Sequence, residues 1–288
     1  MQYRGAIICD NSGMTFPPTS KDDALFHLAF YQFVRIDDPD ALVNWLRQIT
    51  QALRGSILVA QEGINGVVAG TGGALDTFQQ ELSAEPRFAS MPFKRSDCVT
   101  APFGRMKVHK KSEIVYMGVD GIDAVRKTGV AVSPLAWRAL LDDDDVVVID
   151  NRNSFEYRLG RFRNAIDPQV ANFRDLPTFI EANLPEWQAA GKRVAMYCTG
   201  GIRCEKTSAW MHDKGIEVLQ LDGGILNYFQ TMPDAEKDWQ GECFVFDNRI
   251  ALDTKLQETA TTLEQVYDSE PDGAWRLQRA RRLQQSDK

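Results

Sequence analysis

Hydrophobic residues in the first hundred positions switch repeatedly between strand spacing and helix spacing. Leu25 to Ile36 is rich in aromatic and branched residues, which is typical of a strand, and Asp38-Pro39 is a helix start signal. The first predicted elements are a strand at 25–36 and a helix that carries Leu42, Leu46, Ile49 and Leu53 and ends at Gly55. Two short strands follow at 57–60 and 66–70, joined by residues 62–65. A second helix carries Leu75, Phe78 and Leu82, and a last strand is predicted at 93–99. This order predicts a ferredoxin-like α+β domain, with helices on one face of an antiparallel sheet.

The second half of the chain alternates strands with helices. Ser133-Pro134 caps a helix that reaches Leu141, and Val146-Val-Val-Ile149 is a continuous branched run typical of a fully buried strand. Further strands are predicted at 193–197 and 217–221, and further helices near 154–158, 175–183, 204–214 (closed by Gly215) and 225–231. Such alternation predicts an α/β domain whose parallel sheet has helices on both faces.

A basic stretch, Arg105-Met-Lys-Val-His-Lys-Lys111, marks the junction between the two domains. We expect a first domain at 1–118, a second at 119–238, and a C-terminal segment at 239–288. Residues 239–247 alternate enough for one strand, and helices are predicted at 256–267 and 274–285. The polar, charged composition from Thr254 onward predicts a helical tail that is loosely attached.

Composition limits the class of protein. The 288 residues, 43% of them hydrophobic, can form more than one domain, and the formal charge of −7 argues against a protein that coats nucleic acid nonspecifically, although a local basic face can still bind it. The five cysteines at 9, 98, 198, 204 and 243 include no Cys-x-x-Cys pair, so we expect neither a disulfide framework nor a zinc site. No apolar run approaches membrane-spanning length, so we expect a cytoplasmic protein without membrane contact.

The segment Cys198-Thr-Gly-Gly-Ile-Arg203 is the strongest chemical signal. It lies between a predicted strand and a predicted helix, where unsatisfied N–H groups, the helix dipole and the nearby guanidinium all favour an anion. Gly200 and Gly201 leave the backbone open to such an anion. We therefore expect Cys198 to be a reactive thiolate near neutral pH. Four residues between cysteine and arginine, one fewer than in Cys-x5-Arg phosphatases, favour sulfur or thiolate chemistry over phosphate ester hydrolysis.

The second half resembles a rhodanese domain. Cys198 stands at the persulfide cysteine of that family, Arg203 closes its loop, and Leu221-Asp-Gly-Gly-Ile225 is similar to its second signature. Asp150 and Arg152 match the Asp-x-Arg that follows an early strand. Gly160-Arg161-Phe162, in place of Gly-His-Ile, and Tyr228, where tryptophan is frequent, depart from the pattern and argue against a simple thiosulfate sulfurtransferase.

Four segments together narrow this resemblance to the TrhO family of rhodanese-containing, oxygen-dependent tRNA uridine hydroxylases. They are Gln61-Glu-Gly-Ile-Asn-Gly66, Lys107-Val-His-Lys-Lys111, Tyr197-Cys-Thr-Gly-Gly-Ile-Arg-Cys-Glu-Lys206 and Gly241-Glu-Cys-Phe-Val-Phe-Asp247, and the likeness covers about residues 25–253. It implies an acylphosphatase-like first domain, tRNA as partner, dioxygen as cosubstrate and hydroxylation of wobble uridine at C5. The cysteine-rich C-terminal segment of many relatives is missing from this sequence, so its metal-binding role is not carried over.

The sequence identifies no cofactor and no electron donor. Its three histidines, at 27, 109 and 212, do not form a 2-His-1-carboxylate pattern, and there is no dinucleotide fingerprint, so no metal or flavin site is visible. One hypothesis needs neither group: the Cys198 thiolate adds to C6 of uracil and makes C5 carbanion-like toward oxygen. The alternative is a persulfide on Cys198 that acts as reductant or sulfur carrier.

The loop residues Thr199, Gly200, Gly201 and Ile202 are expected to form the active site with Cys198, and Arg203 to organise it. Cys204 either resolves an oxidised Cys198 or simply packs there. Asp150 and Arg152 are expected to hold the loop from behind by hydrogen bonding.

The predicted tRNA contacts are basic. If the stretch after Arg105 is a strand, Lys107, His109 and Lys111 share one face, which can bind phosphates; the alternative is a solvated surface run. The full set of candidates is Arg105, Lys107, His109, Lys110, Lys111, Arg161 and Arg163, with Arg276, Arg279, Arg281 and Arg282 as a weaker group.

Two other functions compete with hydroxylation. A sulfurtransferase would move sulfane sulfur through a Cys198 persulfide, and a docking module would use the rhodanese domain to bind RNA or protein. The intact Cys198, Arg203 and loop glycines argue against the docking module.

Overall fold

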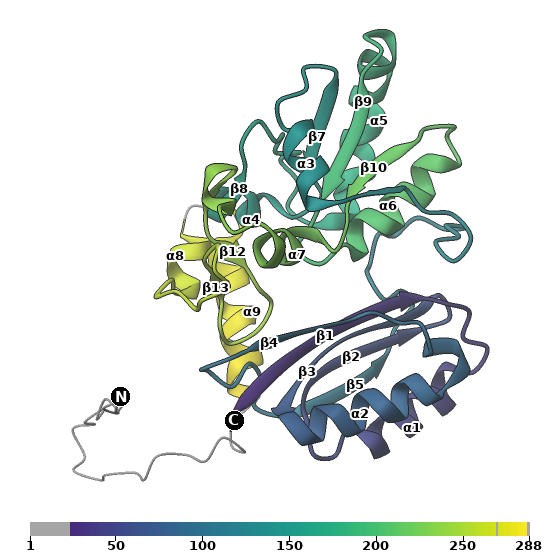
Figure 1. Cartoon of the computed structure of the whole chain (residues 1–288), viewed down its shortest axis with the longest axis vertical. Helices are drawn as coiled ribbons and strands as arrows, with labels where there is room; N and C mark the ends of the chain where they lie inside the picture. Colours follow the sequence, from purple (N-terminus) through teal and green to yellow (C-terminus); the bar gives the residue numbers. More distant parts are fainter. Residues whose placement is uncertain (1–23, 269, 287–288) are drawn as a thin grey trace.

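The computed structural model describes residues 24–268 and 270–286. Two α/β domains lie one above the other, and the C-terminal segment runs along their side (Figure 1). Cys9 and the rest of 1–23 lie outside the described residues. Within the part described, no helix is long and apolar enough to cross a bilayer.

The N-terminal domain has the predicted ferredoxin-like arrangement plus one strand. Its strands are β1 (Leu25–Phe33), β2 (Arg54–Ala60), β3 (Gly63–Thr71), β4 (Phe93–Asp97) and β5 (Met106–Lys110), in the spatial order β4-β1-β3-β2-β5. The first four pair antiparallel, and β5 pairs parallel to β2 at the edge. The basic stretch is therefore the edge strand of this sheet. Helices α1 (Pro39–Ile49) and α2 (Gly72–Ala84), with a 3₁₀ turn at Pro86–Phe88, cover one face (Figure 1).

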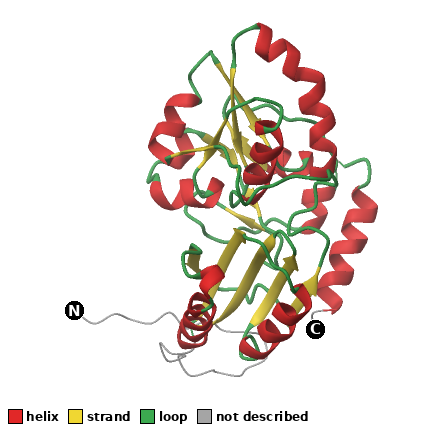
Figure 2. Cartoon of the chain, turned by 90° about the vertical axis from the view of Figure 1, so that its right-hand side faces the viewer, coloured by secondary structure: helices red, strands yellow, loops and turns green. Residues whose placement is uncertain are grey.

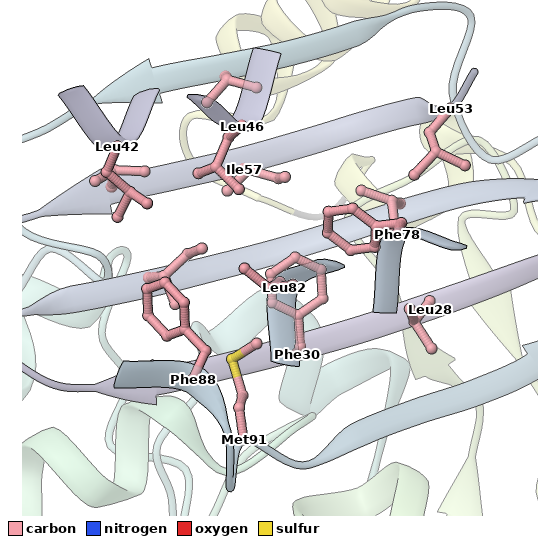
Figure 3. Close-up of a cluster of buried hydrophobic side chains, with 14 of the residues drawn as sticks. Leu28, Phe30, Leu42, Leu46, Leu53, Ile57, Phe78, Leu82, Phe88 and Met91 are labelled. Atoms are coloured by element: carbon pink, nitrogen blue, oxygen red, sulfur yellow. The ribbon is translucent and has the colours of Figure 1, made fainter. Parts of the chain in front are cut away.

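Strand alternation divides this sheet into an apolar face and a second, more polar face. Ile57 of β2 and Val108 of β5 point into the helix-covered core, where Leu28, Leu46 and Phe78 lie (Figure 3). Period-two geometry places the intervening residues on the opposite face, toward the second domain.

One predicted boundary is wrong. Helix α1 ends at Ile49 with Thr50 as its cap, and Gly55 lies inside β2. Gly55 has φ +151°, and a Cβ there would lie 2.2 Å from the Val67 carbonyl oxygen of the neighbouring strand. The glycine therefore permits close strand pairing rather than helix termination.

The second domain has the predicted parallel sheet. Strands β6 (Val130–Val132), β7 (Val146–Asp150), β9 (Arg193–Tyr197) and β10 (Val218–Leu221) lie in the order β6-β10-β9-β7. Its helices are α3 (Pro134–Leu140), α4 (Ser154–Leu159), α5 (Leu176–Ala189), α6 (Ile202–His212) and α7 (Gly224–Thr231), with 3₁₀ turns at Phe173–Asp175 and Ala235–Lys237. Helices lie on both sides of the strands (Figure 2). Successive residues of β9 enter opposite cores, as expected for a sheet buried on both faces.

The prediction that 146–149 is fully buried is wrong for half of the strand. β7 is at the edge of the sheet, and Val146 and Val147 are half-buried, while Val148 and Ile149 are buried. The branched residues therefore reflect strand propensity as well as burial.

The C-terminal segment differs most from its prediction. The single strand expected at 239–247 is two strands, β11 (Trp239–Gly241) against β8 (Gly160–Phe162) and β12 (Cys243–Phe244) against β13 (Ala251–Leu252). Gly241, with φ +80°, makes the break. Helices α8 (Leu263–Tyr267) and α9 (Gly273–Ser286) follow.

The expected loose attachment of the tail is also wrong. A buried cluster joins α8 to the second domain through Phe155, Phe244, Leu263, Val266 and Tyr267. Arg276 of α9 is buried and donates to the Ala171 carbonyl at 2.7 Å. Apolar contacts therefore fix a segment whose composition is mostly polar.

Candidate active site at the Cys198 loop

The reactive cysteine lies between strand β9 and helix α6, as predicted. Cys198 is 1% exposed, and the Gly201 N–H donates to its Sγ at 3.1 Å. Gly201 has φ +106° and precedes Ile202, the first residue of α6, two residues earlier than the predicted start of this helix. The left-handed glycine turns the first N–H groups of the helix toward the sulfur, where they can stabilise a negative charge.

These contacts change the acidity of the thiol. Burial by itself raises the pKa of Cys198. Three influences outweigh burial: a hydrogen bond from the Cys204 thiol, the positive charge of Arg203, and hydrogen bonds from the backbone N–H groups of Cys204 and Gly201. Together they lower the pKa of Cys198 to about 5. Cys198 is therefore a thiolate at neutral pH. Cys204 is also buried, and burial together with the hydrogen bond that its thiol donates to Cys198 raises the pKa of Cys204 well above the ordinary value. The two thiols thus divide into an ionised acceptor and a protonated donor.

Helix α7 holds the other side of the loop. The N–H groups of Ile225 and Leu226 donate to the carbonyls of Cys198 (3.0 Å) and Thr199 (3.2 Å). Gly224 has φ +70°, and a Cβ there would lie 2.5 Å from the Cys198 carbonyl oxygen. The segment Leu221-Asp-Gly-Gly-Ile225 therefore supports the Cys198 loop through close contact between their backbones.

Arg203 is fixed by a residue that the sequence analysis missed. Its guanidinium donates to both carboxylate oxygens of Glu156, at 2.8 and 2.9 Å, and lies 3.4 Å from the Thr199 hydroxyl. Burial raises the pKa of Glu156, but the Arg203 charge and hydrogen bonds lower it overall, so the carboxylate is ionised. Glu156 lies three residues after Asn153, whose N–H donates to it at 3.1 Å. That capping-box spacing was a signal for the helix start, although not for the Arg203 contact.

Asp150 and Arg152 do not act as predicted. They form a fully buried ion pair with each other at 2.6 Å, and Arg152 also donates to the Gly160 carbonyl. The Arg152 guanidinium lies over the Tyr197 ring, 5.6 Å from its centroid. Their hydrogen bonds thus fix the start of β8. They reach the Cys198 loop indirectly, because Arg152 lies on Tyr197, the residue before Cys198, and its charge helps to keep Glu156 ionised.

The N-terminal domain covers the loop. Lys94 of β4 donates to the carbonyls of Gly200 at 2.8 Å and Gly223 at 2.6 Å. Burial lowers the pKa of Lys94, although the Cys198 charge opposes this. Tyr31 of β1 lies over Gly201, where an added Cβ would be 2.8 Å from the Tyr31 hydroxyl oxygen. Both residues come from the polar face of the sheet, and no sequence motif indicated either one.

A second contact between the domains is a charge cluster around a buried lysine. Lys206 of α6 is 2% exposed and donates to Glu62 at 2.8 Å and to Glu113 at 2.5 Å. Glu62 also accepts from the Ile114 N–H at 2.7 Å. Glu62 and Lys206 both lie in segments that carry the sequence resemblance, so their positions were visible but their pairing was not. The cluster fixes the helix that starts at the Cys198 loop against the N-terminal domain.

The predicted tRNA contacts lie in two places. Lys107 and His109 share the predicted face of β5 and line one groove, whereas Lys110 pairs with Asp40 at 2.5 Å and Lys111 is exposed just beyond the strand. Arg105 is exposed before β5 and, with Lys107 and His109, lines a second hollow at the sheet edge.

Arg161 and Arg163 lie at the edge of the second domain. Arg161 is over the Tyr157 ring, 5.1 Å from its centroid. Arg163 pairs with Asp142 and with the buried Asp238. The charge of Arg163 is therefore matched within the protein, which makes it the weakest of the predicted tRNA contacts.

Metal-ligating side chains do not gather anywhere in the described part of the chain: no group of three His, Cys, Asp or Glu residues has a suitable geometry there. The arrangement around Cys198 can bind an anion or act as a nucleophile. It consists of a thiolate, an ordered guanidinium, helix N–H groups and a lysine.

Comparison with known proteins agrees with this geometry. A family profile described as a UPF0176 acylphosphatase-like domain matches residues 26–114, and one for a rhodanese-like domain matches residues 133–231. A protein of Synechococcus elongatus named tRNA uridine(34) hydroxylase is 48% identical over 237 residues, which are 81% of this chain and 87% of that protein. The chain belongs to the tRNA uridine(34) hydroxylase family.

Other members of the tRNA uridine(34) hydroxylase family match over similar lengths. A protein of that name from Jannaschia is 45% identical and covers 80% of this chain and 76% of its own length; one from Legionella pneumophila is 40% identical, with 84% and 96% covered. Among solved structures, a rhodanese-like domain protein from Staphylococcus aureus covers 34% of this chain and 90% of its own, with 18% identity and a TM-score of 0.25. Family membership thus extends across both domains.

Proposed function

We propose that this protein hydroxylates the wobble uridine of tRNA at C5, with Cys198 as the reactive residue. The observation that carries the proposal is a buried thiolate, held by Arg203 and helix N–H groups, in a chain whose relatives at 40–48% identity are named tRNA uridine(34) hydroxylase. tRNA is then the macromolecular substrate, and the cytoplasm is its place of action.

The reaction proceeds by covalent activation of the base. The Cys198 thiolate adds to C6 of uracil, which makes C5 carbanion-like, and C5 then attacks dioxygen to give a C5 hydroperoxide after protonation. Reduction of the O–O bond leaves the hydroxyl on C5 and releases water. Loss of the C5 proton and of the sulfur from C6 restores the aromatic base and the thiolate.

The electron balance requires a reductant. Uracil, O₂, two electrons and two protons give 5-hydroxyuracil and water, so we propose a thiol-class compound as the two-electron donor. Cys204, whose thiol contacts Cys198, is the candidate to reduce the hydroperoxide: its sulfur takes the outer oxygen as a sulfenic acid, and two external thiol groups then restore the Cys204 thiol, releasing water and a disulfide.

The test is turnover by purified protein on unmodified tRNA with a dithiol reductant. Mass spectrometry of the nucleosides should show 5-hydroxyuridine carrying one ¹⁸O under ¹⁸O₂, and none without oxygen or with Cys198→Ala. Cys98→Ala is the matched control, because Cys98 is only half-buried and the charges that act on it, Arg249, Glu258, Asp247 and Asp97, do not belong to the loop; it should leave turnover intact. Product formed by Cys198→Ala, or product that lacks the label, would contradict the mechanism.

Cys204→Ser separates the two roles left open for Cys204. If Cys204 reduces the hydroperoxide, this variant forms 5-hydroxyuridine only as fast as the dithiol reaches the hydroperoxide directly, so turnover slows and depends steeply on dithiol concentration. Full multi-turnover activity would leave Cys204 with a packing role only.

Sulfur transfer is a second candidate, favoured by the rhodanese-like match and the Cys-x4-Arg loop. In that reaction Cys198 attacks a sulfane sulfur donor, carries the sulfur as a persulfide and passes it to a nucleophile. Thiocyanate release from thiosulfate and cyanide, lost in Cys198→Ala, would support it. Unlabelled or absent 5-hydroxyuridine together with thiocyanate release would place sulfur transfer first.

A further inference from the structure

A groove outside the Cys198 loop combines aromatic and basic side chains from three parts of the fold. It has a volume of about 530 Å³ and lies between the polar face of β2 and β5, the loop after β12, and helix α9. This volume is within the range of about 300–1,000 Å³ that is usual for ligand sites. The side chains that matter here are Phe103, Lys107, His109, Phe246, Trp275 and Arg279.

Two of the aromatic rings are exposed where a folded protein normally buries them. Phe246 is 65% exposed and Trp275 is 53% exposed, and both line the groove. Phe246 is supported from behind by Phe244, with ring centroids 4.9 Å apart, and the Arg279 guanidinium lies 5.4 Å from the Trp275 ring. These contacts hold the rings in place, and their exposed faces are available for stacking.

The charge of the groove is positive although the chain as a whole carries −7. Lys107, Arg276 and Arg279 line it, together with His109. Arg276 pairs with Asp272, and the exposed Arg279 adds positive charge at the surface of the groove.

The one acidic side chain in the lining is Asp247, which pairs with Arg249 at 2.7 Å and is 4% exposed. Its charge is therefore balanced inside the protein and does not oppose an anionic ligand. Stackable rings beside cations are what single-stranded nucleic acid requires: a platform for bases and positive charge for phosphates.

The groove adjoins the reactive loop through helix α4. Phe155 lines the groove, and the next residue, Glu156, holds Arg203. A nucleotide bound in the groove is thus separated from the Arg203 side of the active site by the first turn of one helix. This placement suits a nucleotide that neighbours the reacting one in the same strand.

We propose that this groove binds single-stranded nucleotides of the substrate RNA next to the uridine that is modified, with Phe246 and Trp275 stacking on bases and Lys107 and Arg279 contacting phosphates. The inference rests on the proposed function for the identity of the RNA. It gives the C-terminal segment, which packs against Phe155 and Phe244 of the fold, a role in substrate binding.

The experiment measures binding of a fluorescein-labelled anticodon stem–loop RNA by fluorescence anisotropy at several KCl concentrations. Trp275→Ala should weaken binding about 5- to 150-fold, because one base stacked on an aromatic ring contributes about 1–3 kcal/mol to the binding free energy. Arg279→Gln should also lower the slope of log affinity against log salt by roughly 0.7, the loss of one phosphate contact on a single strand. Leu135→Ala and Arg126→Gln are the controls, because both residues are exposed and lie outside the groove.

The outcomes separate the groove from the proposed function. The groove assignment is overturned if the groove variants bind RNA as the wild type does, or if the control variants weaken binding equally. This holds even if the wild type makes 5-hydroxyuridine. An acidic peptide would then be the occupant to examine. Groove-dependent RNA binding by a wild type that makes no 5-hydroxyuridine supports the groove and contradicts the proposed reaction. Circular dichroism of each variant confirms that the exposed substitutions leave the fold unchanged.

Discussion

At the scale of residues, the chemistry of this protein depends on the charge around one sulfur. Among the described cysteines, only Cys198 has a lowered pKa; burial raises the pKa of Cys98 and Cys204, and that of Cys243 to about 12. The difference comes from the hydrogen bond of the Cys204 thiol, the Arg203 charge and the helix N–H groups, since burial acts in the same direction on all four thiols.

Removing the Arg203 charge should therefore raise the pKa of Cys198 from about 5 toward its ordinary value. We expect Arg203→Gln to show this as a later rise in thiolate absorbance at 240 nm, measured as the difference from the same variant carrying Cys198→Ser. Arg203→Lys, which keeps the charge, is the matched control and should shift less. An unchanged titration in Arg203→Gln would mean that the Cys204 thiol and the helix N–H groups hold the thiolate without the Arg203 charge.

The same shift affects stability. The folded state holds the Cys198 thiolate at a lower pKa than the unfolded chain does, so its contribution to stability is full above pH 9 and is lost as the pH falls toward 5. The free energy of unfolding lost in Cys198→Ala should consequently be larger at pH 8 than at pH 5.

At the scale of elements, two glycine-led helix starts form the site by close contact. Helix α6 supplies N–H groups to the sulfur, and helix α7 supplies N–H groups to the loop carbonyls. The contact between them requires Gly224, because its left-handed backbone brings it against the atoms of the loop.

Gly224→Ala should destabilise the protein by about 2–4 kcal/mol, the sum of left-handed strain and a displaced loop, and should reduce turnover strongly. Gly215→Ala is a close control: it has φ +76°, similar to the +70° of Gly224, but no atom lies within 4 Å of the added Cβ. It should lose only about 1–2 kcal/mol and keep its turnover. Urea denaturation and the nucleoside assay measure both effects, and equal behaviour of the two variants would show that contact with the loop is unimportant.

At the scale of the whole molecule, the two domains form one site. Lys94 and Tyr31 of the N-terminal sheet lie on the Cys198 loop, and Lys206 joins the second domain to Glu62 and Glu113 of the first. Lys206 is buried and its two carboxylates are partly buried, so the loss of Lys206 leaves two negative charges close together without their counter-charge.

Lys206→Met should lower the free energy of unfolding by about 3–5 kcal/mol at pH 7, while Lys214→Met, which removes an exposed pair with Glu181, should cost about 0–1 kcal/mol. Burial raises the pKa of Glu113, but Lys206 and backbone N–H groups lower it overall. The wild type therefore loses this stabilisation as the pH falls below about 4.5, and the gap to Lys206→Met should narrow there. Urea midpoints across pH check this; similar midpoints for the two variants at pH 7 would contradict it.

The sequence by itself determined most elements of both domains and the reactive loop, although not the short strands β6 and β8. Hydrophobic spacing follows local geometry, and the Cys198, Arg203 and glycine positions lie within one turn of chain, so their relation is already present in the sequence. The two-residue period of a strand also predicted that Lys107 and His109 lie on the same face, and both line the same groove.

Only the tertiary structure decided what surrounds the loop. Three hydrogen bonds around the loop join residues far apart in the sequence: Arg203 to Glu156, Lys94 to Gly200, and Lys206 to Glu62, which are 47, 106 and 144 positions apart. No local pattern specifies which distant side chains meet, because that depends on how the domains pack. For the same reason the polar tail was misjudged: its few apolar residues meet Phe155 and Phe244 across the fold, and only that contact brings Trp275 and Arg279 beside the strand that carries Lys107.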